Sequence, residues 1–489
     1  MKLKNNRILQ YIAVILAIPA AYLLAREVGL ENRGMENFRT GILGLMVIGM
    51  IVLIKAMIRM EGKENEASQE QQMVGLILIM GVLIRVTYML YTPCDVRSHD
   101  LWDFDPASYG HAAYILNIMQ EGHLPETNLI QFYQQPFFYL AGSVMSWFIN
   151  GILGTWDGYS LVDATKTVSC IASCISLLAA RAIFEECGLT GRGLCRAMLI
   201  MAFLPVYFLT GGGVAPDALA GMFMILACLY TIRWTKCRSW KNTVILALIY
   251  GCGMMTKISC ATLALITAIV FIISLIRAVR EHSWKELVLK YIVFGMISLP
   301  LGLWYSIRNY ILFAQPLNYV LELEKNNSLY TGNISIPQRL LVVKLSNLLS
   351  DPYTKVRGDY NLPAYALKSS LFGEFYYNTW GWVSVLLLLS AFLLAAFCTL
   401  AVIRCIVYQR QDRWCRFMLL AAGIFYGSIA IFYLRYPFGC SMDFRYMLFL
   451  PVPMAYLFGR CELFHKKNWG RYADICCFMF SVTSCLMFC

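Results

Sequence analysis

Residues 383–403 read VSVLLLLSAFLLAAFCTLAVI, a continuous run without a single charged side chain. A helix of about 20 apolar residues is long enough to cross the hydrocarbon core of a bilayer. The run does not alternate polar and apolar residues, as a strand of a membrane β-barrel would. It therefore predicts a membrane-spanning α-helix, and it guides the interpretation of the rest of the chain.

The composition extends this interpretation to the whole chain. Of its 489 residues 59% are hydrophobic and only 14% are charged, whereas soluble proteins carry about 25% charged residues. The 18 cysteines are scattered and form no CxxC pair, so a disulfide framework or a cysteine-based metal site is not indicated. A soluble multidomain enzyme and a disordered chain are excluded, and an all-α polytopic membrane protein is predicted.

Thirteen apolar segments are candidate spans. They lie near residues 8–25, 40–59, 73–91, 161–184, 196–211, 214–232, 242–256, 258–276, 288–307, 380–403, 416–435, 445–459 and 471–488.

The net charge of +12 follows from basic clusters between these segments rather than from a nucleic-acid-binding surface. Six clusters, near residues 55–63, 181–196, 233–241, 277–285, 404–416 and 460–471, all fall on the cytoplasmic side if the N-terminus is cytoplasmic. This agreement requires that the further apolar segment 136–154 does not cross the membrane. We expect an interfacial or re-entrant helix there on the outer side, with a fourteenth span as the alternative.

This topology predicts two large outer loops, at about 92–135 and about 308–379. Loops of such length are usually functional or disordered. The predicted organisation is a two-helix extension with a polar linker (1–72), a membrane domain that carries both loops (73–460) and a C-terminal span (461–489).

The first outer loop is rich in carboxylates. Asp100, Asp103 and Asp105 lie within six residues, with His99 beside the first of them. A fixed carboxylate can take a proton from an acceptor hydroxyl or bind a divalent ion, and Asp103 and Asp105 have the spacing of a metal-binding DxD. A solvated acidic loop without a special role is the alternative.

The same loop carries a series of short motifs. They are His99-Asp100, then 110-GHAAYI-115, 122-GHLP-125 and 131-QFYQQPFFYL-140. In this order they resemble the GT-C glycosyltransferases, and within them family 39, the protein-mannosyltransferase and aminoarabinose-transferase-like group. Gln134 and Gln135 depart from that pattern, because the family has His and Pro there.

Further motifs continue the resemblance over about residues 73–455. They are 213-GVAPDAL-219, 251-GCGMMTKISC-260, 304-WYSIRNYILFAQPL-317, 370-SLFGEF-375 and 440-CSMDFRYMLFLPVP-453. Ala314 stands where the family usually has Gly. Seven ionisable residues in the motifs share the outer face in the predicted topology, and ionisable residues at span ends that face one cavity are expected to be used or paired. These seven are Asp100, Asp217, Lys257, Arg308, Glu374, Asp443 and Arg445.

The resemblance implies a polyprenyl-phosphate sugar as donor, a lipid, glycan or protein acceptor, and an extracytoplasmic site in the cell membrane. Inverting transfer needs a base, for which Asp100 is the first candidate and Asp103 and Asp105 the next. Cations stabilise the leaving phosphate, and the candidates are Lys257, Arg308 and Arg445. Orienting or substrate-binding roles fall to His99, Asp217, Asp443, Glu374, Tyr133, Gln135 and Asn309.

A divalent cation is compatible with this site, but no obligatory cofactor is predicted. There are two alternatives to a glycosyltransferase of this group. A lipid-sugar flippase or transporter should show internal repeats and mid-span charges, which are not found. A polysaccharide polymerase or ligase would carry its large loop late in the chain.

Overall fold

The computed structural model describes residues 2–28, 33–59, 66–317, 319–343, 351–355, 359–377 and 381–488. Within these ranges every regular element is helical, apart from an isolated antiparallel bridge between Tyr330 and Phe438. The chain divides into two compact units, which are described separately.

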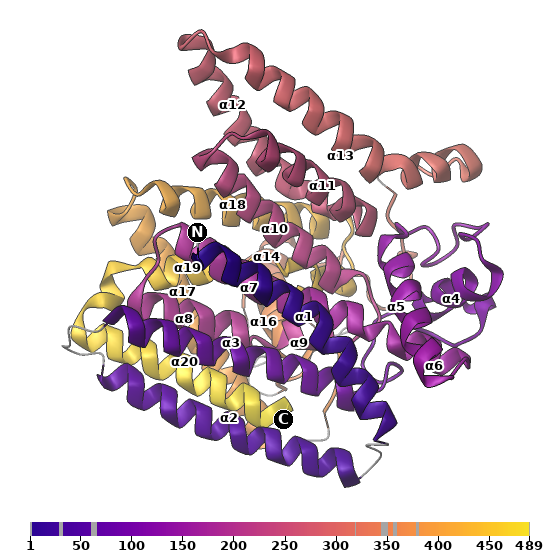
Figure 1. Ribbon diagram of the computed structural model, residues 1–489, viewed down its shortest axis with the longest axis horizontal. Coiled ribbons are helices and arrows are strands. Elements are labelled where there is room, and N and C mark those ends of the chain that lie inside the picture. The colour runs from indigo at the N-terminus through magenta and orange to yellow at the C-terminus, as the bar shows by residue number, and fades with distance from the viewer. Residues whose placement is uncertain are drawn as a thin grey trace. The chain divides into compact units, whose positions relative to one another are not determined.

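Unit 1 comprises residues 1–27, 92–179 and 210–321. It contains the N-terminal helix, the first predicted outer loop and a set of long helices (Figure 1). Its helices are α1 (Lys2–Glu27), η1 (Pro106–Ser108), α4 (His111–Leu116), the π-helical turn η2 (Asn117–Glu121), α5 (Phe137–Leu153), α6 (Gly158–Ala164), the first part of α7 (Lys166–Glu186), α10 (Asp217–Lys236), α11 (Trp240–Thr256), η3 (Ile258–Leu263), α12 (Ala264–Arg280) and α13 (Trp284–Phe313).

Unit 2 comprises residues 28–91, 180–209 and 322–489. In it α2, α3 and α20 lie side by side (Figure 1). Its helices are α2 (Arg33–Arg59), α3 (Glu66–Tyr91), α8 (Gly191–Phe203), α9 (Pro205–Gly211, shared with unit 1), α14 (Ile336–Leu340), α16 (Leu362–Phe372), α17 (Gly381–Tyr408), α18 (Arg413–Arg435), η4 (Gly439–Met442), η5 (Phe444–Met447), α19 (Pro451–Arg460), η6 (Glu462–His465) and α20 (Lys467–Phe488).

The described helices confirm a polytopic membrane protein. Ten are long and apolar enough to cross a membrane, or eleven if the bent pair α8 and α9 forms one span. The uncharged apolar run 383–403 lies within α17. Two of the thirteen predicted spans fall short of this length: α11 has 17 residues and α19 has 10. The segment 136–154 forms α5, a 17-residue apolar helix that is also short of a full span.

The local backbone conformation accounts for the short length of these two helices. Helix α11 ends at Lys257, whose backbone is extended (φ −157°, ψ 124°). Helix α19 begins only at Pro451, because residues 439–447 form two 3₁₀ turns. Residues 60–65, which include part of the predicted linker and of the first basic cluster, lie outside the described residues.

The bend between α8 and α9 is stabilised from other helices of unit 2. Pro205 has no N–H group to donate to the carbonyl of Met201, four residues earlier. The guanidinium of Arg85, fully buried in α3, donates instead to the carbonyl oxygens of Met201 (2.9 Å) and Ala202 (2.8 Å). The Ser484 hydroxyl donates to the next carbonyl, that of Phe203, at 2.8 Å. A buried cation in a span therefore has a structural use here.

Candidate functional site

Asp100 is held in place through its backbone. The N–H of His111 donates to the carbonyl oxygen of Asp100 (3.0 Å), and the N–H of Ala112 donates to that of Leu101 (3.3 Å). These are donors of the first turn of α4, which have no partner within their own helix. The acidic loop (residues 95–105) thus covers the start of α4, and Asp100 is positioned by this contact.

The loop around Asp100 has an unusual backbone. Arg97, Asp100 and Trp102 have φ values of 62°, 54° and 61°, in the left-handed region that L-residues seldom occupy. Gly110 permits the close approach of this loop, because a Cβ there would lie 2.3 Å from the carbonyl oxygen of Leu101 and 2.8 Å from the Cβ of Trp102. Backbone conformations of this kind persist where the surroundings enforce them, and they cluster at functional sites.

The three aspartates of the loop differ in their surroundings. Asp105 caps η1, because its carboxylate accepts the N–H of Ala107 at 2.9 Å. Asp103 is exposed, and its carbonyl accepts the hydroxyl of Ser108. Asp100 and its neighbour His99 are half-buried. Asp100 is therefore the aspartate of the three that combines a fixed backbone with partial shielding from water.

Buried tyrosines lie next to this loop. The imidazole Nδ1 of His111 is 2.7 Å from the hydroxyl of Tyr139, whose ring stacks on Tyr114 with centroids 3.8 Å apart. Burial raises the pKa of Tyr139, and the nearby carboxylates of Asp217 and Asp100 raise it further. Both carboxylates therefore act on one phenol of the same unit.

The other tyrosine of the stacked pair lies near Arg308. Tyr114 donates to the hydroxyl of Tyr305 at 2.9 Å. Burial raises the pKa of Tyr114, while the guanidinium of Arg308 has a lowering influence on it. The stacked pair thus has carboxylates near one ring and a cation near the other.

Arg308 itself makes hydrogen bonds with neutral groups. Its guanidinium donates to the carbonyl oxygen of Pro125 (2.8 Å) and to the side-chain oxygen of Asn309 (3.0 Å), and it lies over the ring of Tyr305. No carboxylate of the described residues forms a salt bridge with it. Arg308 is thus a half-buried cation whose charge is available for an anionic ligand.

Lys257 and Asp217 form an ion pair. The ammonium Nζ of Lys257 lies 2.5 Å from the Asp217 carboxylate, whose side chain is 4% exposed. Asp217 stands in the first turn of α10, where the helix dipole favours a negative charge. The preceding turn reaches the acidic loop, since the N–H of Val214 donates to the hydroxyl oxygen of Ser98 at 3.4 Å.

The residues of the 131–140 motif contact the end of α13. The amide of Gln135 donates to Ser306 (3.3 Å), and the amide of Asn309 donates to the carbonyl oxygen of Tyr133 (3.3 Å). Gln134, which replaces the family histidine, accepts from the hydroxyl of Tyr139 at 3.4 Å. The departures from the family pattern are therefore hydrogen-bonded parts of this unit.

Unit 2 holds the remaining predicted residues. Tyr365 donates to the Glu374 carboxylate at 2.5 Å. Asp443 accepts from the backbone N–H of Arg445 at 3.0 Å, and its carboxylate lies 3.5 Å from the Arg445 guanidinium. Burial raises the pKa of Tyr365, followed by the charges of Glu374 and Asp443.

Glu374 and Asp443 could contribute to a cation site, because a carboxylate oxygen of each lies within 4.8 Å of the other. Oxygen ligands of this type suit Mg²⁺ or Mn²⁺.

Several of these contact residues have no sequence signal of their own. In the sequence His111 stands out only as part of the motif 110–115. The three buried tyrosines, Tyr114, Tyr139 and Tyr305, look like ordinary core residues. Their contribution depends on contacts between segments that are far apart in the chain. Ten of the predicted residues lie in unit 1 and three in unit 2. Among the ten, Asp103 and Asp105 lie at the exposed side of the loop.

Comparisons with known proteins are consistent with the motifs. Residues 143–304, about a third of the chain, match the family described as dolichyl-phosphate-mannose-protein mannosyltransferase. A search of curated proteins finds no match.

Among the solved structures to which this chain is similar is the oligosaccharyltransferase of Archaeoglobus fulgidus tethered with an acceptor peptide. It is 12% identical with a TM-score of 0.46, and the similarity covers 85% of this chain and 55% of that one. The same protein in complex with Zn and sulfate gives 13% identity, a TM-score of 0.41 and coverages of 83% and 52%. ArnT from Cupriavidus metallidurans in the apo state is 12% identical with a TM-score of 0.38, and the similarity covers 80% of this chain and 77% of that one. The chain spans about half the length of the oligosaccharyltransferase.

Proposed function

We propose that this chain is a membrane glycosyltransferase of the GT-C, protein-mannosyltransferase-like class, and that it transfers a sugar from a polyprenyl-phosphate donor to an acceptor hydroxyl. The family match over residues 143–304 supports this proposal. The acceptor belongs to a lipid, a glycan or a protein. The reaction takes place on the extracytoplasmic side of the membrane, and the N-terminus is cytoplasmic.

The observation that carries the proposal is that unit 1 holds both a fixed acid and a cation with neutral hydrogen-bond partners. Asp100 is held by the first turn of α4, and Arg308 is half-buried with neutral hydrogen-bond partners. Tyr114 donates to Tyr305, over whose ring Arg308 lies. Tyr139, which stacks on Tyr114, contacts His111, whose backbone N–H holds Asp100. Inverting transfer needs both a base for the acceptor and a positive charge for the leaving phosphate.

The roles follow from this arrangement. The carboxylate of Asp100 removes the proton of the acceptor hydroxyl as the oxygen of that hydroxyl attacks the anomeric carbon. The bond between that carbon and the phosphate oxygen breaks, and the leaving polyprenyl phosphate gains a negative charge. Arg308 stabilises this charge, with Lys257 as a second cation oriented by Asp217. Arg445 is the third candidate cation, and Asp443 and Glu374 orient groups near it.

Substrate contacts are proposed for three residues where the 131–140 segment meets the end of α13. Tyr133, Gln135 and Asn309 present polar groups near the end of α13. We assign them to the hydroxyl groups of the donor sugar, and His99 to the orientation of Asp100. A divalent cation is not required by this scheme.

Reconstitution in vesicles tests the proposal against the transport alternative. The protein is supplied with radiolabelled polyprenyl-phosphate sugars, and label that leaves the carrier is scored separately from labelled carrier that crosses the bilayer. Transfer off the carrier supports the proposal. Carrier movement without transfer overturns it in favour of a flippase.

Single substitutions then identify the base. Asp100→Asn, Asp103→Asn and Asp105→Asn are compared with Asp157→Asn, an exposed helix cap of the same unit that asparagine can replace. Loss of transfer in Asp100→Asn alone assigns the base to Asp100, and loss in another variant moves the assignment to that residue.

A further inference from the structure

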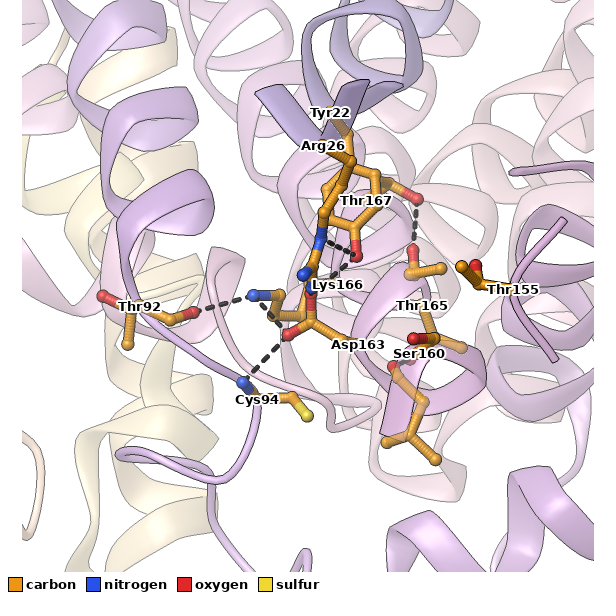
Figure 2. A network of polar contacts seen from close by, with 12 residues as sticks. Tyr22, Arg26, Thr92, Cys94, Thr155, Ser160, Asp163, Thr165, Lys166 and Thr167 are labelled. Atoms are coloured by element: carbon orange, nitrogen blue, oxygen red, sulfur yellow. Dashed lines mark hydrogen bonds and ion pairs between the residues drawn. The ribbon is translucent and has the colours of Figure 1, made fainter. Parts of the chain in front are cut away.

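The carboxylate of Asp163, at the end of α6, is buried and fully hydrogen-bonded. One oxygen accepts from the hydroxyl of Tyr22 and from the guanidinium of Arg26, each at 2.6 Å. The other oxygen lies 2.6 Å from the ammonium of Lys166 and accepts the backbone N–H of Cys94 at 3.0 Å. Figure 2 shows these groups pointing toward Asp163 from three separate segments.

The three segments are distant in sequence. Tyr22 and Arg26 belong to the last turns of α1, whereas Asp163 and Lys166 lie at the junction of α6 and α7. Cys94 stands near the start of the acidic loop. Lys166 makes a second contact with this segment, because it donates to the carbonyl oxygen of Thr92 at 2.7 Å (Figure 2).

A buried ion network of this kind contributes mainly to geometry. The desolvation of the charges offsets most of their attraction, so the net gain in stability is small. A displaced segment, however, would leave charges buried without partners, which is strongly unfavourable. Lys166 and Asp163 have side chains that are each 2% exposed, so the network favours one position of the loop start relative to α1.

From Cys94 the chain leads directly to the proposed base. Ser98 is held by Val214, and Asp100 is held by His111, so Cys94 is the first of three fixed points along this short segment. We infer that α1 contributes to sugar transfer through this network. Asp163 is a positioning residue that fixes the start of the acidic loop and, through it, Asp100. This inference rests on the proposed function.

Cys94 provides a test that does not depend on activity. Its side chain is fully buried, and burial together with the Asp163 carboxylate raises the pKa of its thiol. The thiolate is the reactive form, so Cys94 should react very slowly with N-ethylmaleimide while the network is intact. Labelling at each cysteine is measured over time by peptide mass spectrometry on the full chain in lipid nanodiscs, with the exposed Cys237 as the reference for reagent activity.

Two variants disturb the network, each with a matched control. Asp163→Asn is compared with Asp157→Asn, the cap of the same short helix. Arg26→Gln is compared with Glu27→Gln, an exposed neighbour in the same turn. We expect Cys94 labelling to accelerate at least tenfold in both network variants and to stay within twofold of wild type in both controls. Arg26→Lys, which keeps the charge, should restore most of the protection. The Arg26 side chain is half-exposed, so Arg26→Gln is less disruptive to folding. If Asp163→Asn does not fold, the labelling of Arg26→Gln tests the anchoring alone.

Kinetics separate positioning from a purely structural role. The network holds the start of the loop that carries Asp100, so its loss should displace the base rather than weaken donor binding. We therefore expect kcat to fall at least fivefold in Arg26→Gln, with KM for the polyprenyl-phosphate sugar within twofold of wild type. Unchanged labelling of Cys94 in both network variants would overturn the anchoring. Faster labelling with unchanged kcat would overturn the link to Asp100. If wild type transfers no sugar, the proposed function fails, and labelling still decides whether the network holds the loop.

Discussion

The guanidinium Nη2 of Arg308 donates to the carbonyl oxygen of Pro125 at 2.8 Å. This bond holds a cation at the end of α13 against the segment that follows η2, without neutralising its charge. A backbone carbonyl and a side-chain amide fix the guanidinium in direction, and a fixed cation stabilises developing charge better than a mobile one.

Replacing Arg308 should therefore impair the chemical step. We expect Arg308→Gln to lower kcat/KM about 100-fold or more, the effect of losing one preorganised charge-stabilising donor. Arg308→Lys should recover only part of this, because lysine lacks the planar fork of donors. Initial rates with a labelled polyprenyl-phosphate sugar measure the effect. Arg277→Gln, at an exposed arginine of the same unit, is the control, and an equal loss in that variant would contradict a specific role.

The effects of substitutions at Lys257 and Asp217 on the free energy of unfolding should not be additive. Lys257→Gln leaves the nearly buried Asp217 carboxylate without its ammonium partner. We expect it to reduce the free energy of unfolding by about 3 kcal/mol, the lower end for a broken buried pair, because 22% of the Lys257 side chain is exposed. The double variant Lys257→Gln/Asp217→Asn should recover most of the stability but not the activity. Denaturation in detergent measures the first effect and label transfer the second. Full recovery of activity would show that the pair is structural only.

Gly110 should tolerate no side chain. In Gly110→Ala the new methyl group would lie 2.3 Å from the carbonyl oxygen of Leu101, so the backbone that holds Asp100 must shift. We expect a loss of about 1–3 kcal/mol in stability, typical of overpacking, together with a large fall in kcat. Gly151→Ala in α5 has open space around it and serves as the control. Wild-type kcat in Gly110→Ala would contradict a need for this close approach.

The bend at Pro205 predicts a rescue between helices. Arg85→Met removes two hydrogen bonds from the carbonyls before the bend and should cost about 2–4 kcal/mol, since unsatisfied buried carbonyls are expensive. Adding Pro205→Ala restores an N–H that can donate to Met201. The double variant should therefore lose less stability than the sum of the two single changes. Thermal unfolding of the four proteins gives the coupling, and strict additivity would rule out this explanation.

Much of the fold was predictable because a span has a simple signature. The run 383–403 and the segment 288–307 lie within single long helices, α17 and α13. The ends were less predictable where the backbone changes locally, as in the 3₁₀ turns of 439–447 that delay α19. Ala314 marks such a place, because it ends α13 with φ 54°, a conformation that suits the glycine usual in the family.

The candidate site was predictable only in part. The sequence suggested Asp217 as an orienting residue and Lys257 as a cation, and the structure pairs the two. Sequence could not show that Asp105 caps η1, because this cap depends on a local turn. The contact between Arg26 and Asp163 joins residues 137 positions apart, and no local pattern predicts a partner at that distance.

The most direct test is a single-turnover measurement of polyprenyl phosphate released from a labelled polyprenyl-phosphate sugar, with wild type and Asp100→Asn in the same lipid. The proposed function predicts release coupled to a new glycosidic bond of inverted anomeric configuration in wild type. In folded Asp100→Asn it predicts a rate at least 100-fold lower. Equal rates in the two proteins, or a retained configuration, would contradict the assignment of Asp100 as the base of an inverting transfer.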